Sequence, residues 1–191
     1  MKRITIILIA SLLNISFACS QKENFPPIQE PDQELFKLEK VAEGIDIPWG
    51  LTFTSNDNFL VTDKKGILYH VENGEKFVVT GVPEIVFSRQ GGLLDVAVDS
   101  KFDENQRIYI TASITSSESG SNTALYSAIL SNNNLSDLKL LYKASPDSNE
   151  ERHFGGSLLV TDKYVFFTIG DRGNRDVNPQ DISLDGGKVY R

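Results

Sequence analysis

Short runs of apolar residues, separated by Gly, Asn, Asp and Ser, follow one another from residue 50 onward. The first four runs cover 50–53, 58–62, 66–71 and 76–79. Apolar and polar positions alternate in them, and Glu72-Asn73-Gly74 between the last two is typical of a hairpin turn. Little beyond the first 19 residues has a helical period, so the pattern predicts an all-β protein.

The same order of features returns twice along the chain. Each unit has a glycine, an apolar strand, a polar turn and a second strand that ends near a threonine. The two further units comprise strands at 92–98 and 107–112, and at 156–160 and 164–169. The units therefore start at residues 50, 92 and 156, and an all-strand repeat of about 40–50 residues is typical of β-propeller blades. A β-sandwich of unrelated strands is the alternative.

Three units correspond to about half of a six-bladed ring, so we expect the chain to cover roughly the first half of such a propeller. The sequence ends at 188–191, inside a further predicted strand. The longer second spacing predicts an insertion, either in the loop 116–121 or in the region 132–146.

Residues 1–19 have the pattern of an export signal: Lys2 and Arg3, an apolar run at 4–17, and a small residue before Cys19. The apolar run is too short for an ordinary membrane-spanning helix. Cys19 is the single cysteine, and its position resembles the modified cysteine of bacterial lipoproteins. We therefore expect an exported protein, periplasmic or at the outer surface, that contacts a bacterial membrane through a lipid on Cys19 only. Plain signal cleavage is the alternative.

Residues 20–37 contain Pro26, Pro27 and Pro31 among polar residues, which predicts a flexible tether. The folded body is expected over 38–191, which is long enough for one hydrophobic core. The formal net charge is −7, and no basic stripe is present. This balance argues against nucleic acid as a partner, because such binding depends on the neutralisation of phosphates.

His153 lies just before the glycine pair 155–156, with Phe154 between them. Imidazole titrates near neutral pH, so a histidine held at the start of a strand suits the role of a proton acceptor. The neighbouring glycines allow a ligand to approach the backbone closely. His153 is therefore the candidate catalytic residue, with a structural histidine as the alternative.

Six segments of this chain, in order, resemble the soluble PQQ-dependent aldose sugar dehydrogenases, the glucose/sorbosone dehydrogenase family. They are 47–51 (IPWGL), 60–64 (LVTDK), 90–97 (QGGLLDVA), 153–156 (HFGG), 170–173 (GDRG), and 180–181 ahead of 187–189. The resemblance extends from about residue 38 to the last residue. It implies a six-bladed propeller that oxidises aldoses at C1 to lactones, using pyrroloquinoline quinone (PQQ) held with calcium.

The resemblance also implies roles for three residues. His153 aligns with the general base, which takes the C1 hydroxyl proton while hydride passes to the quinone. Gln90 matches a glutamine that contacts both cofactor and substrate, and its amide can donate and accept hydrogen bonds. Arg172 falls at a cofactor-facing position, where a guanidinium suits the carboxylates of the quinone. An exposed turn arginine is the alternative for Arg172.

The expected partners are an aldose substrate and an external electron acceptor. In the family, the calcium ligands and most basic quinone-binding residues belong to later blades, so no metal ligand is assigned in this sequence. We accordingly expect the 191-residue chain alone to be inactive.

Asp95 lies three residues after Gly92 and Asp171 directly after Gly170, both at predicted blade junctions. A pair of carboxylates can indicate a glycosidase, but aspartates at such turns commonly accept bonds from backbone N–H groups, which we favour. The loop 171–176 lacks the EF-hand spacing, so no metal is assigned there. His70 is expected to be structural. Trp49 is expected to pack in the core or between blades, with sugar stacking as the alternative.

Two other functions stay open at this level. One is a propeller lactonase or esterase, in which metal-bound water attacks a carbonyl and which would need a cluster of carboxylate and amide ligands. The other is a non-catalytic propeller that binds glycans or proteins.

Overall fold

The computed structural model describes residues 37–115 and 119–191, so the predicted signal, Cys19 and nearly all of the predicted tether lie outside the described residues. The chain divides into two units, Met1–Glu39 and Lys40–Arg191, and the second contains all the strands described below. Within the described ranges, no helix has both the length and the apolar character needed to span a membrane.

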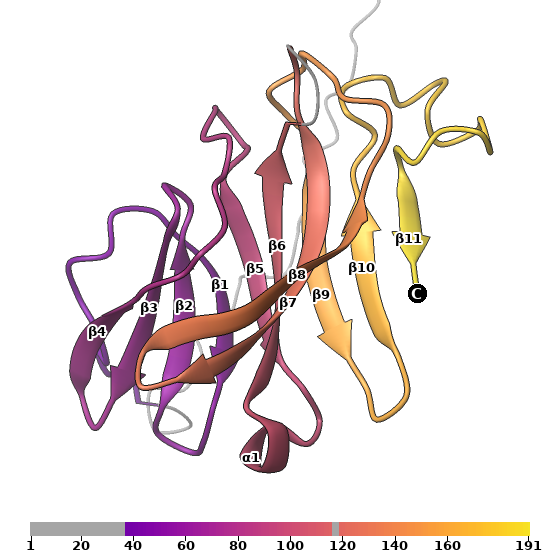
Figure 1. Cartoon of the computed structure of the whole chain (residues 1–191). Helices are drawn as coiled ribbons and strands as arrows, with labels where there is room; N and C mark the ends of the chain where they lie inside the picture. Colours follow the sequence, from indigo (N-terminus) through magenta and orange to yellow (C-terminus); the bar gives the residue numbers. More distant parts are fainter. Residues whose placement is uncertain (1–36, 116–118) are drawn as a thin grey trace, which may run out of the picture. The chain divides into compact units, whose positions relative to one another are not determined.

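Three antiparallel sheets follow one another along the chain (Figure 1). We call them blades 1, 2 and 3. Blade 1 consists of β1 (Pro48–Phe53), β2 (Phe59–Asp63), β3 (Ile67–Glu72) and β4 (Glu75–Val79). Blade 2 consists of β5 (Leu93–Val98), β6 (Arg107–Ile114), β7 (Asn122–Ser131) and β8 (Asn134–Lys143). Blade 3 consists of β9 (Gly155–Val160), β10 (Val165–Ile169) and β11 (Lys188–Tyr190).

The blades stack through their first strands, because β1 contacts β5 and β5 contacts β9. The three predicted units start at or next to these first strands, so the all-β propeller fold is confirmed and the repeat has a structural basis. The single helix among the described residues, α1 (Phe102–Asn105), occupies one of the predicted polar turns.

The predicted insertion is wrong for the region 132–146. Residues 122–143 form the two ten-residue strands β7 and β8, which complete blade 2 and account for much of the long spacing. β8 was not predicted from the sequence, because its register with β7 shifts twice and Asp137 has a φ of 50°. Such irregularities interrupt the alternation by which a strand is recognised.

Most of the core lies between blades 1 and 2. Leu60, Leu68, Leu93, Ile108 and Ile110 are fully buried there. Burying each such side chain contributes about 1.5–3 kcal/mol, which stabilises the stacked sheets. A second cluster joins blades 2 and 3.

Trp49 was predicted to pack in the core or between blades, and it does not lie in the core. It is half exposed on β1, as are Leu51 and Phe53. Leu51 and Phe53 lie opposite Val61 and Phe59 of β2, whereas the register between the two strands shifts at Trp49.

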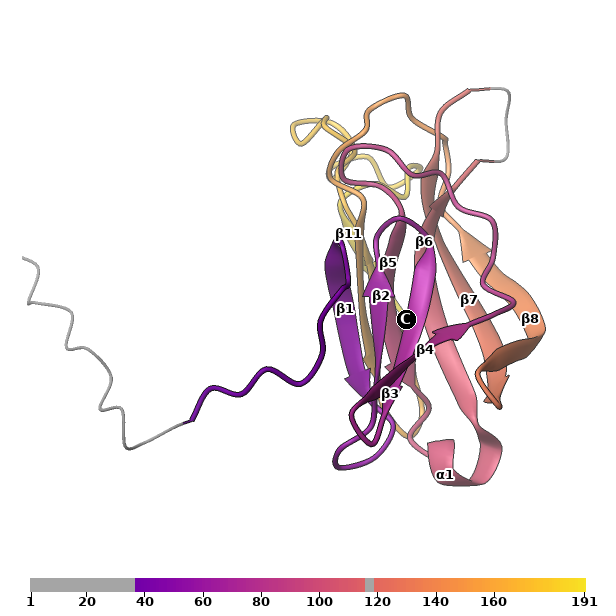
Figure 2. The ribbon, with the colours of Figure 1, turned by 90° about the vertical axis from the view of Figure 1, so that its left-hand side faces the viewer.

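The loops that carry the candidate residues meet at one end of the sheets (Figures 1 and 2). The connections from β4 to β5, from β8 to β9 and from β10 to β11 all reach this end, whereas α1 lies at the opposite end.

Candidate active site

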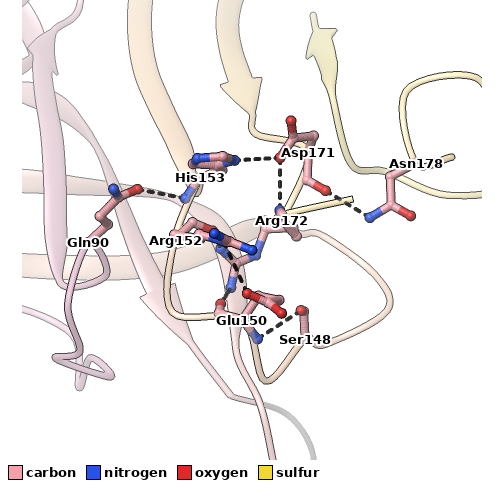
Figure 3. Close-up of polar contacts among 9 residues, drawn as sticks. Gln90, Ser148, Glu150, Arg152, His153, Asp171, Arg172 and Asn178 are labelled. Carbon is pink, nitrogen blue, oxygen red and sulfur yellow. Dashed lines mark hydrogen bonds and ion pairs between the residues drawn. The ribbon is translucent and has the colours of Figure 1, made fainter. Parts of the chain in front are cut away.

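His153 and Asp171 form the centre of the candidate site (Figure 3). His153 precedes β9, Asp171 follows β10, and His153 Nδ1 lies 2.7 Å from Asp171 Oδ1. Because a carboxylate only accepts hydrogen bonds, this contact places the imidazole hydrogen on Nδ1 and leaves the Nε2 lone pair as the acceptor. The His153 side chain is half exposed, so Nε2 belongs to a ring that a substrate can reach.

The backbone holds His153 in an uncommon conformation, with a φ of 54°. A non-glycine residue in this left-handed region costs about 1–2 kcal/mol, which the surroundings must offset. The His153 carbonyl accepts the Arg172 N–H at 3.3 Å. Gly170 packs against the same carbonyl so closely that a Cβ there would lie 2.0 Å from its oxygen. The site therefore requires glycine at position 170.

Gln90 fixes the other side of His153. Gln90 Oε1 accepts the backbone N–H of His153 at 2.7 Å, and the Gln90 N–H donates to the carbonyl of Glu151 at 3.0 Å. The structure thus brings together the two residues that the sequence assigned to base and ligand contact. Because Oε1 already accepts a hydrogen bond, the Nε2 amide group of Gln90 is the part best suited to donate to a ligand.

Lys64 supports the Gln90 loop, a role that sequence reasoning missed. Its side chain is buried, its ammonium donates to the Arg89 carbonyl, and it lies 5.0 Å and 5.6 Å from the ring centroids of Trp49 and Phe87. The Lys64 carbonyl also accepts the Leu93 N–H at 3.0 Å. The charged end and the backbone of one residue therefore hold both ends of the loop that carries Gln90.

Arg172 is 2% exposed, so the alternative of an exposed turn arginine is wrong. Its guanidinium donates to the carbonyls of Arg152, Glu150 and, at 3.4 Å, Ser121. It also stacks on Phe154, with 3.5 Å between the guanidinium carbon and the ring centroid.

Burial lowers the pKa of Arg172 to about 10, while the nearby carboxylates, Glu150 first, act in the opposite direction. The side chain is therefore charged at neutral pH and holds the loop before His153 in place. Its Nε is buried without a hydrogen-bond partner in the described part of the chain. Contact between Arg172 and a cofactor stays a prediction.

Asp171 does more than the sequence indicated. It ties its turn as expected, because Oδ1 accepts the Gly173 N–H at 2.8 Å, and it also holds His153. Burial acts to raise the pKa of Asp171, but the hydrogen bonds from His153 and Gly173 and the nearby positive charges outweigh it, so this pKa lies below its ordinary value. Asp171 is thus a carboxylate at neutral pH.

Asp95 accepts hydrogen bonds from backbone N–H groups, as predicted. Its carboxylate accepts the N–H of Val96 at 2.9 Å and that of Leu158, in blade 3, at 2.8 Å. Burial raises the pKa of Asp95 despite these bonds. His70 is likewise held by neighbours, with Nδ1 2.8 Å from Asn133 Oδ1 and Nε2 3.3 Å from Thr54 Oγ1.

A polar hollow of about 370 Å³ lies beside this site. Arg89, Asn149, Glu150, Glu151 and Arg152 line it, and Arg152 pairs with Glu150 at 3.1 Å. In residues 37–115 and 119–191, no group of three or more His, Cys, Asp or Glu side chains is arranged to hold a metal ion.

Stacked antiparallel sheets with polar residues in the loops at one end define a β-propeller protein. Residues 45–191 match the family model described as Glucose / Sorbosone dehydrogenase, and the chain belongs to this family. Its relatives include the aldose sugar dehydrogenase YliI of Escherichia coli K12, which is 30% identical over 160 residues. The match covers 81% of this chain and 43% of YliI.

Solved structures share the fold. The apo-form of the soluble aldose sugar dehydrogenase from E. coli superposes with a TM-score of 0.71 at 30% identity, covering 76% of this chain and 43% of that one. The PQQ-bound aldose sugar dehydrogenase from Streptomyces coelicolor has a TM-score of 0.70 at 23% identity, covering 81% and 46%. The chain spans about two fifths of the length of the curated relatives it matches, 41% and 43%.

Proposed function

We propose that the protein containing this chain oxidises aldose sugars at C1 to lactones with PQQ, and that His153 is the general base. The observation that carries the proposal is the bond of 2.7 Å between His153 Nδ1 and Asp171 Oδ1. A histidine oriented in this way by a carboxylate, on a ring half open to solvent, is suited to accept a proton at neutral pH.

The donors around His153 fit an anionic quinone. Arg89 and Arg152 bring guanidinium groups to the hollow, where Arg152 pairs with Glu150 and Glu151 also lines the wall, and Gln90 presents its amide. Guanidinium and amide N–H groups are the donors that recognise carboxylates and quinone oxygens. Gln90 and Arg172 are the residues that would hold PQQ in this chain. When bound, PQQ supplies the oxidant that accepts the C1 hydrogen with its electron pair.

The chain's own residues then manage the proton and the geometry. His153 Nε2 takes the proton of the C1 hydroxyl, so that the C1–O bond can become a carbonyl as hydride leaves C1. Asp171 stabilises the imidazolium that forms, because its carboxylate remains hydrogen bonded to Nδ1. Gln90 holds the His153 backbone and can donate from Nε2 to a sugar or quinone oxygen.

Reconstitution of the full-length protein with PQQ and calcium tests this function. Addition of an aldose should reduce an artificial electron-accepting dye and yield the corresponding lactone, and Gln90→Ala should weaken both binding and turnover. Failure of aldoses to reduce the dye with PQQ and calcium present would exclude the reaction. We propose further that calcium accompanies PQQ through ligands outside these residues, and that the 191-residue chain alone neither binds PQQ tightly nor turns over.

We also propose that the protein is exported and anchored through a lipid on Cys19. The support is the sequence of residues 1–19. In cells fed with a labelled fatty acid, the wild-type protein should carry the label and sediment with membranes, whereas Cys19→Ala should do neither. Equal labelling of the two proteins would contradict the anchor.

A further inference from the structure

A polar hollow of about 640 Å³ lies at the α1 end of the sheets, opposite the candidate active site (Figures 1 and 2). We call it the distal hollow. Blade 1 lines it with the β1–β2 turn and β3, and blade 2 lines it with α1 and the β7–β8 turn. Its volume falls within the range of about 300–1,000 Å³ that is usual for pockets that bind small molecules. Neither Gln90 nor His153 lines it, so a ligand bound there would not contact the candidate base.

His70 links the two walls of the distal hollow. It belongs to β3 in blade 1 and is 8% exposed. Its Nδ1 lies 2.8 Å from Oδ1 of Asn133, in the β7–β8 turn of blade 2, and its Nε2 lies 3.3 Å from Thr54 Oγ1. Because an amide oxygen only accepts, Nδ1 carries the imidazole hydrogen, and the Thr54 hydroxyl can donate to Nε2. Both ring nitrogens are bonded within the protein, so His70 positions the groups around it.

Three amide side chains that line the hollow are each held through one end. Asn133 Oδ1 accepts from His70, and Asn58 Oδ1 accepts the N–H of Asn73 at 3.0 Å. The Nδ2 groups of both asparagines have no hydrogen-bond partner within residues 37–115 and 119–191. Gln106 is held in the opposite sense, because its Nε2 donates to a backbone carbonyl of α1 at 2.9 Å and its Oε1 remains as an acceptor. The hollow therefore has two oriented donor groups and one oriented acceptor.

Two carboxylates add further acceptors, one on each wall. Glu72 belongs to β3 and Asp103 to α1, and no lysine or arginine of the described residues lines the hollow with them. A carboxylate only accepts hydrogen bonds, so a ligand must donate to these groups, and an anion would be repelled. The buried side chains of Phe102 and Leu130 form the apolar part of the wall.

We propose that the distal hollow binds a neutral carbohydrate unit. Each hydroxyl group of a sugar both donates and accepts, so neighbouring hydroxyls can donate to Glu72, Asp103 and Gln106 Oε1. The same hydroxyls can accept from the free amide hydrogens of Asn58 and Asn133. The C–H groups of a pyranose ring suit the apolar wall.

A glycan bound in the distal hollow would hold the protein by the end that carries α1. The loops with His153, at the other end of the sheets, would remain free (Figure 1). The inference therefore concerns a second binding site, and it does not depend on the proposed oxidation.

NMR titration of the full-length protein with the methyl glycosides of glucose, galactose and mannose tests the proposal. These sugars are neutral, and galactose and mannose each differ from glucose in the orientation of one hydroxyl group. The methyl group on the C1 oxygen prevents oxidation at C1. At least one of the three should shift the imidazole signal of His70 in a saturable way. The signal of His153 reports separately on the active-site end.

Asp103→Ala should weaken the binding of that glycoside by about 10-fold, because a hydrogen bond to a charged group is lost. Glu104→Ala is the matched control, since Glu104 is an exposed carboxylate of the same helix that does not line the hollow. It should leave the dissociation constant unchanged. Equal dissociation constants for the two variants would contradict the proposal.

The other outcomes also decide it. If none of the glycosides shifts the His70 signal up to its limit of solubility, the hollow does not bind a sugar and the proposal is wrong. A shift of the His153 signal alone would place the sugar at the active-site end, which also contradicts the proposal. If the diamine cadaverine displaces the glycoside at a lower concentration, the carboxylates select a cation, and a neutral carbohydrate is the wrong ligand.

Discussion

The carboxylate of Asp171 lies 2.7 Å from Nδ1 of His153, although 18 residues separate them in the sequence. One residue comes before β9 and the other after β10, so the hairpin between them sets the contact. The contact fixes which imidazole nitrogen carries the hydrogen, and every role that we propose for His153 depends on that assignment.

Asp171→Asn should reduce kcat for aldose oxidation by about 10²–10⁴-fold. The amide can donate to Nδ1, which favours the tautomer with its hydrogen on Nε2 and removes the proton acceptor. Initial rates with saturating PQQ and calcium measure the effect. Asp176→Asn changes an exposed carboxylate of the same loop and should be silent. Equal activity of both variants would remove Asp171 from the mechanism.

The lowered pKa of Asp171 predicts a pH dependence of stability. A carboxyl whose pKa is lower in the folded state stabilises the fold above its unfolded pKa of about 3.9, and this contribution disappears as pH falls through the folded value. The wild type should therefore exceed Asp171→Asn in Tm at pH 6–7, and the difference should shrink below about pH 4. A difference that is constant from pH 7 to pH 3 would contradict this account.

Gly170→Ala should destabilise the protein by about 2–4 kcal/mol, because the new methyl group would collide with the His153 carbonyl. Denaturant titration measures the loss, and kcat should fall with it as His153 is displaced. Gly74→Ala is the comparison, since a Cβ at Gly74 meets no atom within 4 Å and introduces only the strain of a φ of 82°. A smaller cost at Gly170 than at Gly74 would contradict the packing argument.

Lys64→Met should cost about 1–3 kcal/mol, because the buried ammonium is lost while the apolar stem is kept. The Gln90 loop should loosen, so the amide of His153, which is bonded to Gln90, should exchange its hydrogen faster. Lys65→Met is the matched control: Lys65 is half exposed and pairs with Asp46, and its loss should destabilise the protein much less than the loss of Lys64 does. An unchanged rate of amide hydrogen exchange at His153 in Lys64→Met would show that Lys64 does not stabilise the site.

The sequence predicted the repeating units, because the first strands and their glycines recur in a simple order. It did not reveal β7 and β8, whose bulges break the alternation, or the exposure of Trp49, which depends on which sheets cover β1. In the site, His153 was identified from its neighbouring residues and Gln90 from the family resemblance, and the two are in contact. The hydrogen bond that His153 donates to Asp171, and the bond that Lys64 donates to the Arg89 carbonyl, form only when distant loops meet at one end of the sheets, so no local pattern contains them.

His153→Asn tests the central claim most directly. Asparagine tolerates the left-handed backbone at this position and cannot act as a base, so the fold should persist. With PQQ, calcium and an aldose, the full-length variant should retain its Tm within a few degrees and lose about 10²–10⁴-fold in kcat. A folded variant whose kcat stays within twofold of the wild type would contradict the assignment of His153 as the general base.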